Sequence, residues 1–274
     1  MKNGVLLIRP SNTENLIMKN AILNVSEGLA PSTAGVGPAP LWKRVLDVGC
    51  ILLALPVLLP LMIALAVLIK CVSRGPILFL QERVGYRGSR FICFKFRTMK
   101  MNADTGVHQQ HLADLIRSNA PMVKMDAKGD PRLIPFGSLL RATGLDELPQ
   151  LLNVLGGQMS LVGPRPCVPY EFEQYLPSQK RRFETLPGLT GLWQVSGKNK
   201  TTFCEMISLD IHYAENRSPW LDLKIISRTL PVLISQVREA RAKRKNIERR
   251  VGNPSPLPFD PDSIRRESRL EVQP

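Results

Sequence analysis

Two adjacent acids, Asp146 and Glu147, stand near the start of the segment LDELPQLLNVL, just before a proline and an apolar run with helical spacing. One explanation is helix capping, because Asp146 is a good N-cap residue and Pro149 fits the first turn, where its missing N–H costs nothing. The other explanation is chemistry. Adjacent helical residues point about 100° apart, so both carboxylates can face one site only at a helix terminus. The helix dipole there favours ionised carboxylates, which suits a nucleophile or a Mg²⁺ ligand.

Basic side chains that could bind an anion occur in three other segments. In FKFRTM, Lys95 and Arg97 share one face of a predicted strand, because side chains alternate with a period of two. A solvated strand face is the alternative. Arg165 stands between two prolines in VGPRP, whose stiff backbone suits a guanidinium held ready for phosphate, although a plain rigid turn would also explain it. Arg141 lies shortly before the acidic pair. We expect these cations to bind phosphate.

A third acid, Asp222, stands alone in the apolar segment WLDLKI. A buried or membrane-proximal carboxylate needs a partner or a cation, and a helix N-cap is the alternative. Other metal sites are not indicated. His108 and His111 could share a helix face but have no second pair of ligands nearby, and the five cysteines are scattered as reduced, mostly buried thiols would be.

A long apolar segment must hold this site near a membrane. From residue 48 to residue 69 there is no charged side chain, and at 1.5 Å per residue this run can cover the ~30 Å hydrocarbon core. A core helix of a soluble protein is the less favoured alternative.

The flanks of this segment suggest how it meets the membrane. Lys43 and Arg44 precede it and further basic residues follow it, so the distribution of positive charge does not indicate which end of the segment faces the cytoplasm. Pro56 and Pro60 fall in the middle, where each removes a helical hydrogen bond. We therefore predict a bent, re-entrant helix over 41–72 that enters and leaves the membrane by the same face. A conventional span kinked at the prolines is the alternative.

The net charge of +14 points to an anionic partner, which could be nucleic acid, phospholipid or a phosphorylated substrate. Aromatic residues make up only 6% of the chain and no nucleic-acid-reading motif occurs, so nucleic acid is not favoured.

The chain divides into a flexible leader (1–40), the membrane helix (41–72), one mixed domain (73–237) and a basic, Pro-rich tail (238–274) that is disordered or lies on anionic lipid headgroups. Within the mixed domain the patterns predict two strands and several helices. The strands are 76–85 and 90–99, and the helices are 103–120, one from about 146, one near 170–184, 201–216 and 220–237.

From Lys43 to about Leu233 the sequence resembles the monotopic phosphoglycosyl transferases, bacterial enzymes that load a sugar phosphate onto a polyprenyl phosphate. The matching pieces occur in the family's order: KRVLD, QERVGYRG, FICFKFRTM, LDELPQLLNVL, MSLVGPRP, PGLTGLWQVSGKN and LDLKI. The resemblance implies an α+β fold. In it a re-entrant membrane helix–break–helix precedes a small, mixed, mostly helical cytoplasmic catalytic domain with amphipathic helices on the membrane surface.

The resemblance also implies roles for the acids. Asp146 would be the catalytic nucleophile and Glu147 the second catalytic acid. A Mg²⁺ ion would be held by Asp146, Glu147 and Asp222. The break in the membrane helix would fall at Pro60.

For phosphate binding the resemblance implies Lys95, Arg141 and Arg165, and the strand pattern adds Arg97. The chain departs from the family at Leu59, Gly144 and Gln158, where serine, serine and aspartate are usual.

The implied reaction transfers a hexose-1-phosphate from a UDP-sugar to undecaprenyl phosphate through a phospho-aspartate and releases UMP. It would be the first membrane step of exopolysaccharide synthesis, at the cytoplasmic face of the bacterial inner membrane, ahead of downstream glycosyltransferases. Galactose-1-phosphate is the expected group, with glucose-1-phosphate the alternative. Two other classes remain open: a non-catalytic membrane anchor for polysaccharide assembly, and a membrane-tethered nucleic-acid binder.

Overall fold

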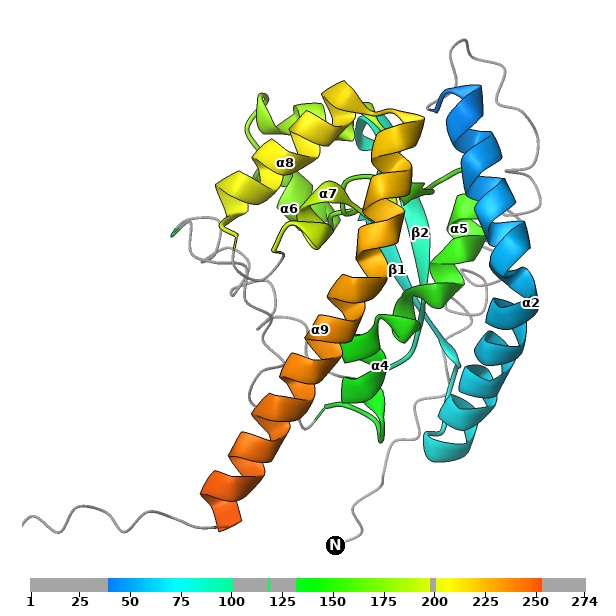
Figure 1. Cartoon of the computed structure of the whole chain (residues 1–274), viewed down its shortest axis with the longest axis vertical. Helices are drawn as coiled ribbons and strands as arrows, with labels where there is room; N and C mark the ends of the chain where they lie inside the picture. The colour runs from blue at the N-terminus through cyan, green and yellow to red at the C-terminus, as the bar shows by residue number, and fades with distance from the viewer. Residues whose placement is uncertain (1–38, 101–117, 119–131, 198–200, 253–274) are drawn as a thin grey trace, which may run out of the picture.

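The computed structural model describes residues 39–100, 118, 132–197 and 201–252 (Figure 1). This part of the chain is mostly helical and carries two small sheets of two strands each. The predicted leader and, apart from one residue, the predicted helix at 103–120 lie outside the described residues. The elements, with 3-10 helices written η, are α2 (Leu41–Val72), β1 (Leu78–Val84), η1 (Tyr86–Gly88), β2 (Arg90–Phe96), α4 (Gly137–Thr143), η3 (Leu145–Gln150), α5 (Leu151–Leu155), β3 (Ser160–Val162), α6 (Pro169–Glu173), η4 (Gln179–Glu184), β4 (Gly188–Thr190), α7 (Leu192–Val195), α8 (Phe203–Asn216) and α9 (Pro219–Gly252).

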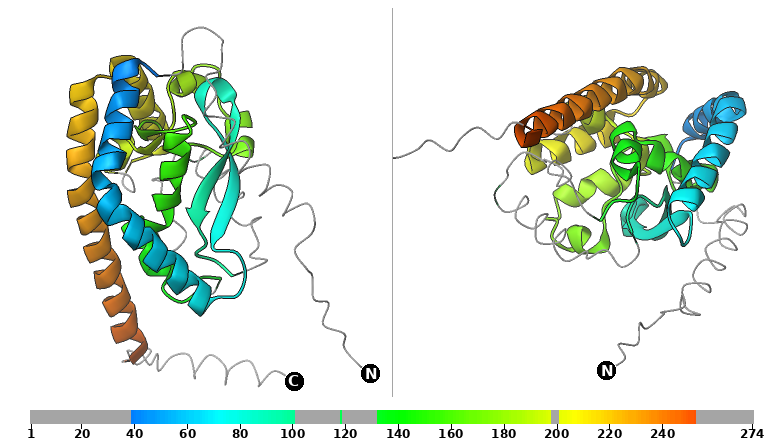
Figure 2. Two further views of the ribbon diagram at one scale, coloured as in Figure 1. Left: turned by 90° about the vertical axis from the view of Figure 1, so that its right-hand side faces the viewer. Right: turned by 90° about the horizontal axis from the view of Figure 1, so that it is seen from below.

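The apolar segment forms one helix, α2, that is long and apolar enough to cross a membrane. Only 11% of its most apolar 18-residue stretch is buried, whereas the core helix of a soluble protein would be mostly buried. Pro56 and Pro60 lie inside the helix, which bends but is not interrupted (Figure 2). The expected break at Pro60 is therefore a bend, because a proline removes one helical hydrogen bond without forcing the helix to end.

Both halves of α2 pack on the same domain, along whose side the helix runs (Figure 1). Near its start, Ile51 joins a core cluster with Phe91 of β2 and Leu151 of α5. Near its end, Leu65 and Ile69 join another cluster, whose buried members from the domain are Phe96, Ile134 and Leu140. The rest of the helix surface exposes large aliphatic side chains.

The first sheet is the antiparallel pair β1–β2, with Leu78 opposite Phe96 and Val84 opposite Arg90. It confirms the two predicted strands. One face of β2 packs against η3, the segment that carries the acidic pair.

The second sheet is the parallel pair β3–β4, which the sequence did not predict because each strand has only three residues. The two backbones approach so closely that glycine is required. A Cβ at Gly188 would lie 2.0 Å from the nitrogen of Gly163, and one at Gly163 would lie 2.3 Å from the carbonyl oxygen of Leu186. This packing fixes the VGPRP segment, which leaves β3, beside the PGLTG segment.

The predicted helix at 170–184 is two pieces, α6 and η4, because Pro177 lies between them and disfavours a continuous helix. The predicted helix at 201–216 is confirmed as α8, whose start is fixed by a capping box of Thr202 and Glu205. The last helix, α9, runs past the predicted end at 237 as far as Gly252. The sequence predicted that the basic tail begins at residue 238, but the helix continues to Gly252, because the Ala, Arg, Lys and Glu residues of this segment are good helix formers.

Candidate active site

The acidic pair lies in η3, a 3-10 helix that follows directly on α4. Gly144 ends α4 in the left-handed conformation (φ +71°), which suits a residue without a Cβ, and its carbonyl accepts a hydrogen bond of 3.0 Å from the N–H of Glu147. Gly144 and Gln150 are the N-cap residues of η3 and α5, and neither helix has a side-chain capping bond. Asp146 is therefore not the N-cap residue that the capping explanation required. Both acids are half-buried.

A lysine from the neighbouring strand reaches the acidic pair. The Nζ atom of Lys95 lies 2.9 Å from Oε1 of Glu147, with side chains 20% and 33% exposed. Because both side chains remain partly open to solvent, a substrate can approach this ion pair. The contact joins β2 to η3 and sets a positive charge next to Asp146.

Further charges gather around Cys93, a fully buried thiol on β2. Burial raises the pKa of this thiol above its usual range. The charged groups that act on it are those of Lys95, Arg83, Glu147 and Arg165. Charges from β1, β2, η3 and the VGPRP segment therefore meet in one region, as an anion-binding site requires.

Arg165, like Lys95, is a partly exposed cation of this group. Its side chain makes no hydrogen bond to any residue that the structure describes, and it lies near the buried Arg83. Burial and the like charge of Arg165 together lower the pKa of Arg83. A partly exposed guanidinium such as that of Arg165 suits the binding of an anion such as phosphate.

Arg141 lies in the last turn of α4, which packs against η3. Lys95 thus contacts Glu147, Arg141 lies in the helix that packs against η3, and Arg165 acts on the same buried thiol as Glu147. What these side chains bind stays a prediction.

Arg97 does not share this region, which corrects the prediction of a phosphate-binding pair on β2. Its two terminal nitrogens donate to the carbonyl oxygens of Arg74 and Ser73, at 2.8 and 2.9 Å, and its side chain is buried. Arg97 therefore fastens the backbone that leaves α2. Alternation along the strand indicated a shared face with Lys95, but β2 ends at Phe96 and the two side chains reach different partners.

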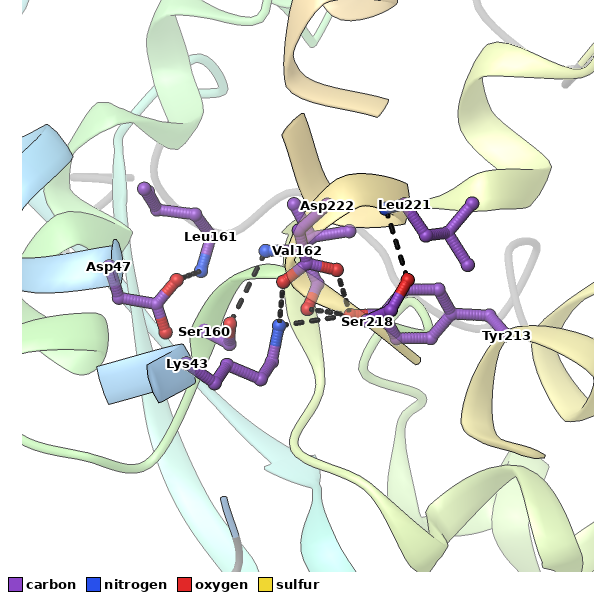
Figure 3. Close-up of polar contacts among 9 residues, drawn as sticks. All are labelled: Lys43, Asp47, Ser160, Leu161, Val162, Tyr213, Ser218, Leu221 and Asp222. Atoms are coloured by element: carbon purple, nitrogen blue, oxygen red, sulfur yellow. Dashed lines mark hydrogen bonds and ion pairs between the residues drawn. The ribbon is translucent and has the colours of Figure 1, made fainter. Parts of the chain in front are cut away.

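Asp222 also has a different role from the one predicted. Its Oδ2 lies 2.6 Å from Nζ of Lys43, and its Oδ1 accepts a hydrogen bond of 2.7 Å from the hydroxyl of Tyr213 (Figure 3). All three side chains are 0% exposed. Leu233 of α9 lies against Gly144, and Asp222 stands eleven residues earlier, about 16 Å along the helix. With one oxygen held by Lys43 and the other by Tyr213, Asp222 is not placed to share a metal ion with the acidic pair.

The sequence analysis missed the polar residues at the start of α2, which it interpreted as charges flanking a membrane segment. Lys43 points inward to Asp222, and Asp47 accepts a hydrogen bond of 3.0 Å from the backbone of β3. Arg44 donates to the last two carbonyls of α5, those of Val154 and Leu155. Lys43 and Asp47 lie four residues apart, on one face of the helix, and this spacing was the signal that could have revealed an inward polar face.

The donor set suits one metal better than others. Within the described ranges there is no group of three or more His, Cys, Asp or Glu side chains that could hold a metal ion. Zinc and calcium sites need such a group, whereas Mg²⁺ is commonly bound by one or two carboxylates together with substrate phosphates. Asp146 and Glu147 fit that pattern as a pair.

Comparisons with known proteins identify one family. The profile of the family described as Bacterial sugar transferase matches residues 39–236. The exopolysaccharide production protein ExoY of Sinorhizobium fredii is 39% identical over 191 residues, which are 70% of this chain and 84% of ExoY. A UDP-glucose:undecaprenyl-phosphate glucose-1-phosphate transferase of Caulobacter vibrioides is 41% identical over 212 residues, 73% of this chain and 74% of that enzyme. An undecaprenyl-phosphate galactose phosphotransferase of Salmonella typhimurium is 39% identical over 198 residues, but this match spans only 40% of the Salmonella enzyme.

Proposed function

The chain belongs to the family of bacterial sugar transferases, and from this membership we propose that it is a phosphoglycosyl transferase. It transfers a hexose-1-phosphate from a UDP-sugar to undecaprenyl phosphate and releases UMP. The observation that carries the proposal is the half-buried acidic pair on η3, with Lys95 2.9 Å from Glu147 and Arg165 nearby. Relatives named for galactose and for glucose phosphate transfer support the reaction class.

In the first step, a carboxylate oxygen of Asp146 attacks the sugar-side phosphorus of the UDP-sugar. A bond forms between this oxygen and phosphorus, the bond from phosphorus to the oxygen that bridges the two phosphates breaks, and UMP leaves with the electron pair. Lys95 and Arg165 offset the negative charge that develops on the phosphoryl oxygens and on UMP. Glu147 holds the Lys95 ammonium next to the reacting atoms.

In the second step, a phosphate oxygen of undecaprenyl phosphate attacks the same phosphorus. The acyl phosphate bond to Asp146 breaks, the carboxylate is restored, and the lipid carries a diphosphate-linked sugar. The two steps let one small site serve first a soluble donor and then a membrane acceptor.

Asp146 and Glu147 are the residues that would hold Mg²⁺, together with oxygens of the substrate diphosphate. The ion supplies charge neutralisation to the diphosphate when it is bound. Asp222 is left out of this set because Lys43 and Tyr213 occupy both its oxygens.

A re-entrant membrane helix fits the way in which α2 is attached. Lys43 near its start bonds to Asp222, and Ser73 just after its end bonds to Arg97. Both ends are thus fastened to one domain, which supports ends on the same side of the bilayer. Four large apolar side chains on α9 are also exposed and recur at helical spacing, as in a helix lying on a membrane surface: Trp220, Leu223, Leu230 and Ile234. We assign the domain to the cytoplasmic face of the inner membrane, where UDP-sugars are made.

We propose galactose as the transferred sugar, because the TGLWQVSGKN segment resembles that of family members that transfer galactose-1-phosphate. Glucose is the alternative. The product would start an exopolysaccharide chain that downstream glycosyltransferases extend. The test is UMP release from a panel of UDP-sugars by the purified protein with Mg²⁺, with and without undecaprenyl phosphate. We expect sustained release only when both a UDP-hexose and the lipid are present. No release from any UDP-sugar would favour a non-catalytic membrane anchor.

A further inference from the structure

The backbone around Arg165 is held more tightly than a surface loop needs to be. Four consecutive carbonyl oxygens, those of residues 164–167, each accept a hydrogen bond of 2.8 to 3.0 Å. The flanking prolines have no N–H, so this loop is fastened through its carbonyl groups. In the order of their acceptors, the donors are the N–H of Gly188, the side chain of Arg182, the side chain of Arg83 and the N–H of Val84.

Two of these donors are buried arginines from different elements. Arg182 of η4 is 1% exposed, and its Nη2 donates to the carbonyl of Arg165 at 3.0 Å. The same guanidinium also donates to Asp210 at 2.5 Å and to the hydroxyl of Tyr175 at 2.7 Å. These partners fix the orientation of the guanidinium, and through it the position of the Arg165 carbonyl. Burial raises the pKa of Asp210 to about 6, so the carboxylate that holds Arg182 is ionised at pH 7 and above.

Arg83 of β1 holds the next carbonyl. It is 7% exposed, and its Nη1 donates to the oxygen of Pro166 at 3.0 Å while its Nη2 donates to Gln81 at 2.6 Å. Its Nε is buried without a hydrogen-bond partner in the described part of the chain. A buried arginine with an unsatisfied donor, close to the like charge of Arg165, is costly for the fold. A cost of this kind beside a proposed active site calls for a functional reason.

We propose that Arg83 and Arg182 are positioning residues for the transfer reaction. They hold two successive carbonyls, of Pro166 and Arg165, and so aim the Arg165 guanidinium at the substrate phosphate. Neither touches the substrate, because their terminal nitrogens are engaged within the protein. The inference rests on the proposed function and adds to it the means by which the phosphate-binding arginine is pre-organised.

The test is a double-mutant cycle with Arg165. Arg83→Lys and Arg182→Lys each keep the charge but lose the rigid fork of donors. We expect each to lower kcat/KM for the UDP-sugar about tenfold, mainly through KM, as for the loss of one well-placed hydrogen bond. In an Arg165→Met background, where no guanidinium remains to be aimed, the same changes should cost less than about twofold.

Two exposed arginines provide matched controls. Arg181 is next to Arg182 and pairs with Glu215 on the surface, and Arg90 pairs with Glu82. Their lysine variants should keep the wild-type kcat/KM.

The thiol of Cys167 gives a readout that does not depend on activity. Cys167 directly follows Arg165 and Pro166, whose carbonyls the two arginines hold, and it is 1% exposed. Site-resolved alkylation of Cys167 should be faster in Arg83→Lys and Arg182→Lys than in the two control variants. Cys93 should stay protected, since it reports on the fold as a whole. If Cys93 also reacts in Arg182→Lys, Asp210→Asn replaces that variant, because it weakens the hold on Arg182 without removing a buried side chain, and Gln81→Met replaces Arg83→Lys in the same case.

The outcomes separate the two proposals. Equal losses with and without Arg165, or unchanged Cys167 alkylation in folded variants, would overturn the positioning role and leave the proposed reaction standing. A wild-type rate in Arg165→Met alone would instead contradict the role that the proposed function gives to Arg165.

Discussion

At the scale of single residues, Lys95 of β2 and Arg97, which directly follows the end of this strand, have different roles. Lys95 meets Glu147 at the candidate site, whereas Arg97, two positions on, binds the backbone that leaves α2. One group is partly exposed and the other is buried. The partial exposure of Lys95 and its contact with Glu147 indicate a catalytic role. The burial of Arg97 and its hydrogen bonds to backbone carbonyls indicate that it stabilises the fold.

This division predicts opposite effects of two matched substitutions. Lys95→Met should lower kcat/KM at least about a hundredfold, since it removes a charge that meets the developing negative charge, while the melting temperature changes little. Arg97→Met should lower the free energy of unfolding by roughly 2 kcal/mol, because two backbone carbonyls lose the hydrogen bonds that the buried guanidinium donates. Enzyme assays and thermal unfolding in detergent measure both. A stable Arg97→Met protein that lost as much activity as Lys95→Met would restore the phosphate-binding role first predicted for Arg97.

The buried thiols near the site give a pH prediction. Burial raises the pKa of Cys93, and that of Cys167 to about 12. A raised pKa keeps the thiol protonated until the pH approaches that value, so the reactive thiolate is scarce at pH 8. Alkylation of both should be slow at pH 8 compared with the exposed Cys204 and should speed up on denaturation. Rapid modification of Cys93 in the native enzyme would mean that the site is open to solvent.

The sequence named an acidic pair with cations around it, and the structure shows Lys95 in contact with Glu147, while the roles of Asp146, Arg141 and Arg165 stay predictions. Residue types and their order were not enough for Arg97 and Asp222. A period of two says which face of a strand a side chain occupies, but not which distant backbone it reaches. For Asp222, the rule that a buried carboxylate needs a cation was right, and the cation is Lys43, 179 positions away in sequence.

At the scale of elements, the start of α2 is fastened to four others. Lys43 binds α8 and α9 through Tyr213 and Asp222, Arg44 binds the end of α5, and Asp47 binds β3. Because α5 follows η3 directly, the membrane helix is linked to the segment that carries the acidic pair.

The buried pair of Lys43 and Asp222 predicts a strong coupling. Lys43→Met or Asp222→Leu alone leaves one buried charge without its partner and should lower the free energy of unfolding by about 3–5 kcal/mol. The double variant should recover much of this loss. Unfolding of the single and double variants in detergent measures the coupling. A stable Asp222→Asn protein that specifically lost its Mg²⁺ dependence would show that Asp222 is a metal ligand after all.

Elements with a long local pattern were predicted correctly, and the short ones were not. The strands β1 and β2 and the helix α8 repeat their apolar residues often enough to be recognised. In contrast, β3 and β4 have three residues each and are defined by pairing across the chain and by glycine contacts that no local pattern encodes. The bend that the sequence predicted in α2 is present, but the helix continues through Pro60, because a proline in the sequence does not reveal whether a helix bends or ends there.

At the scale of the whole molecule, α2 lies along one domain and keeps an exposed apolar surface. Hydrogen bonds near the start of α2 and just after its end attach both ends of the helix to the same domain. This is the arrangement that a domain confined to one membrane face requires.

Cysteines at the two ends of α2 test this topology. In a background without the native thiols, Leu41→Cys and Arg74→Cys should both resist a membrane-impermeant reagent in intact cells and react after lysis. The reason is that both positions belong to a body that we place on the cytoplasmic side. Labelling of Leu41→Cys without lysis would indicate a helix that spans the membrane.

The central claim is that Asp146 carries the sugar phosphate between the two substrates, and trapping that species tests it most directly. The wild-type protein is mixed with Mg²⁺ and either UDP-galactose or UDP-glucose, without any lipid acceptor, then quenched and digested for mass spectrometry. We predict one hexose phosphate on the peptide that contains Asp146, its loss when undecaprenyl phosphate is added, and its absence in Asp146→Asn. The hexose phosphate on a different residue, or UMP release at the wild-type rate from Asp146→Asn, would contradict the account.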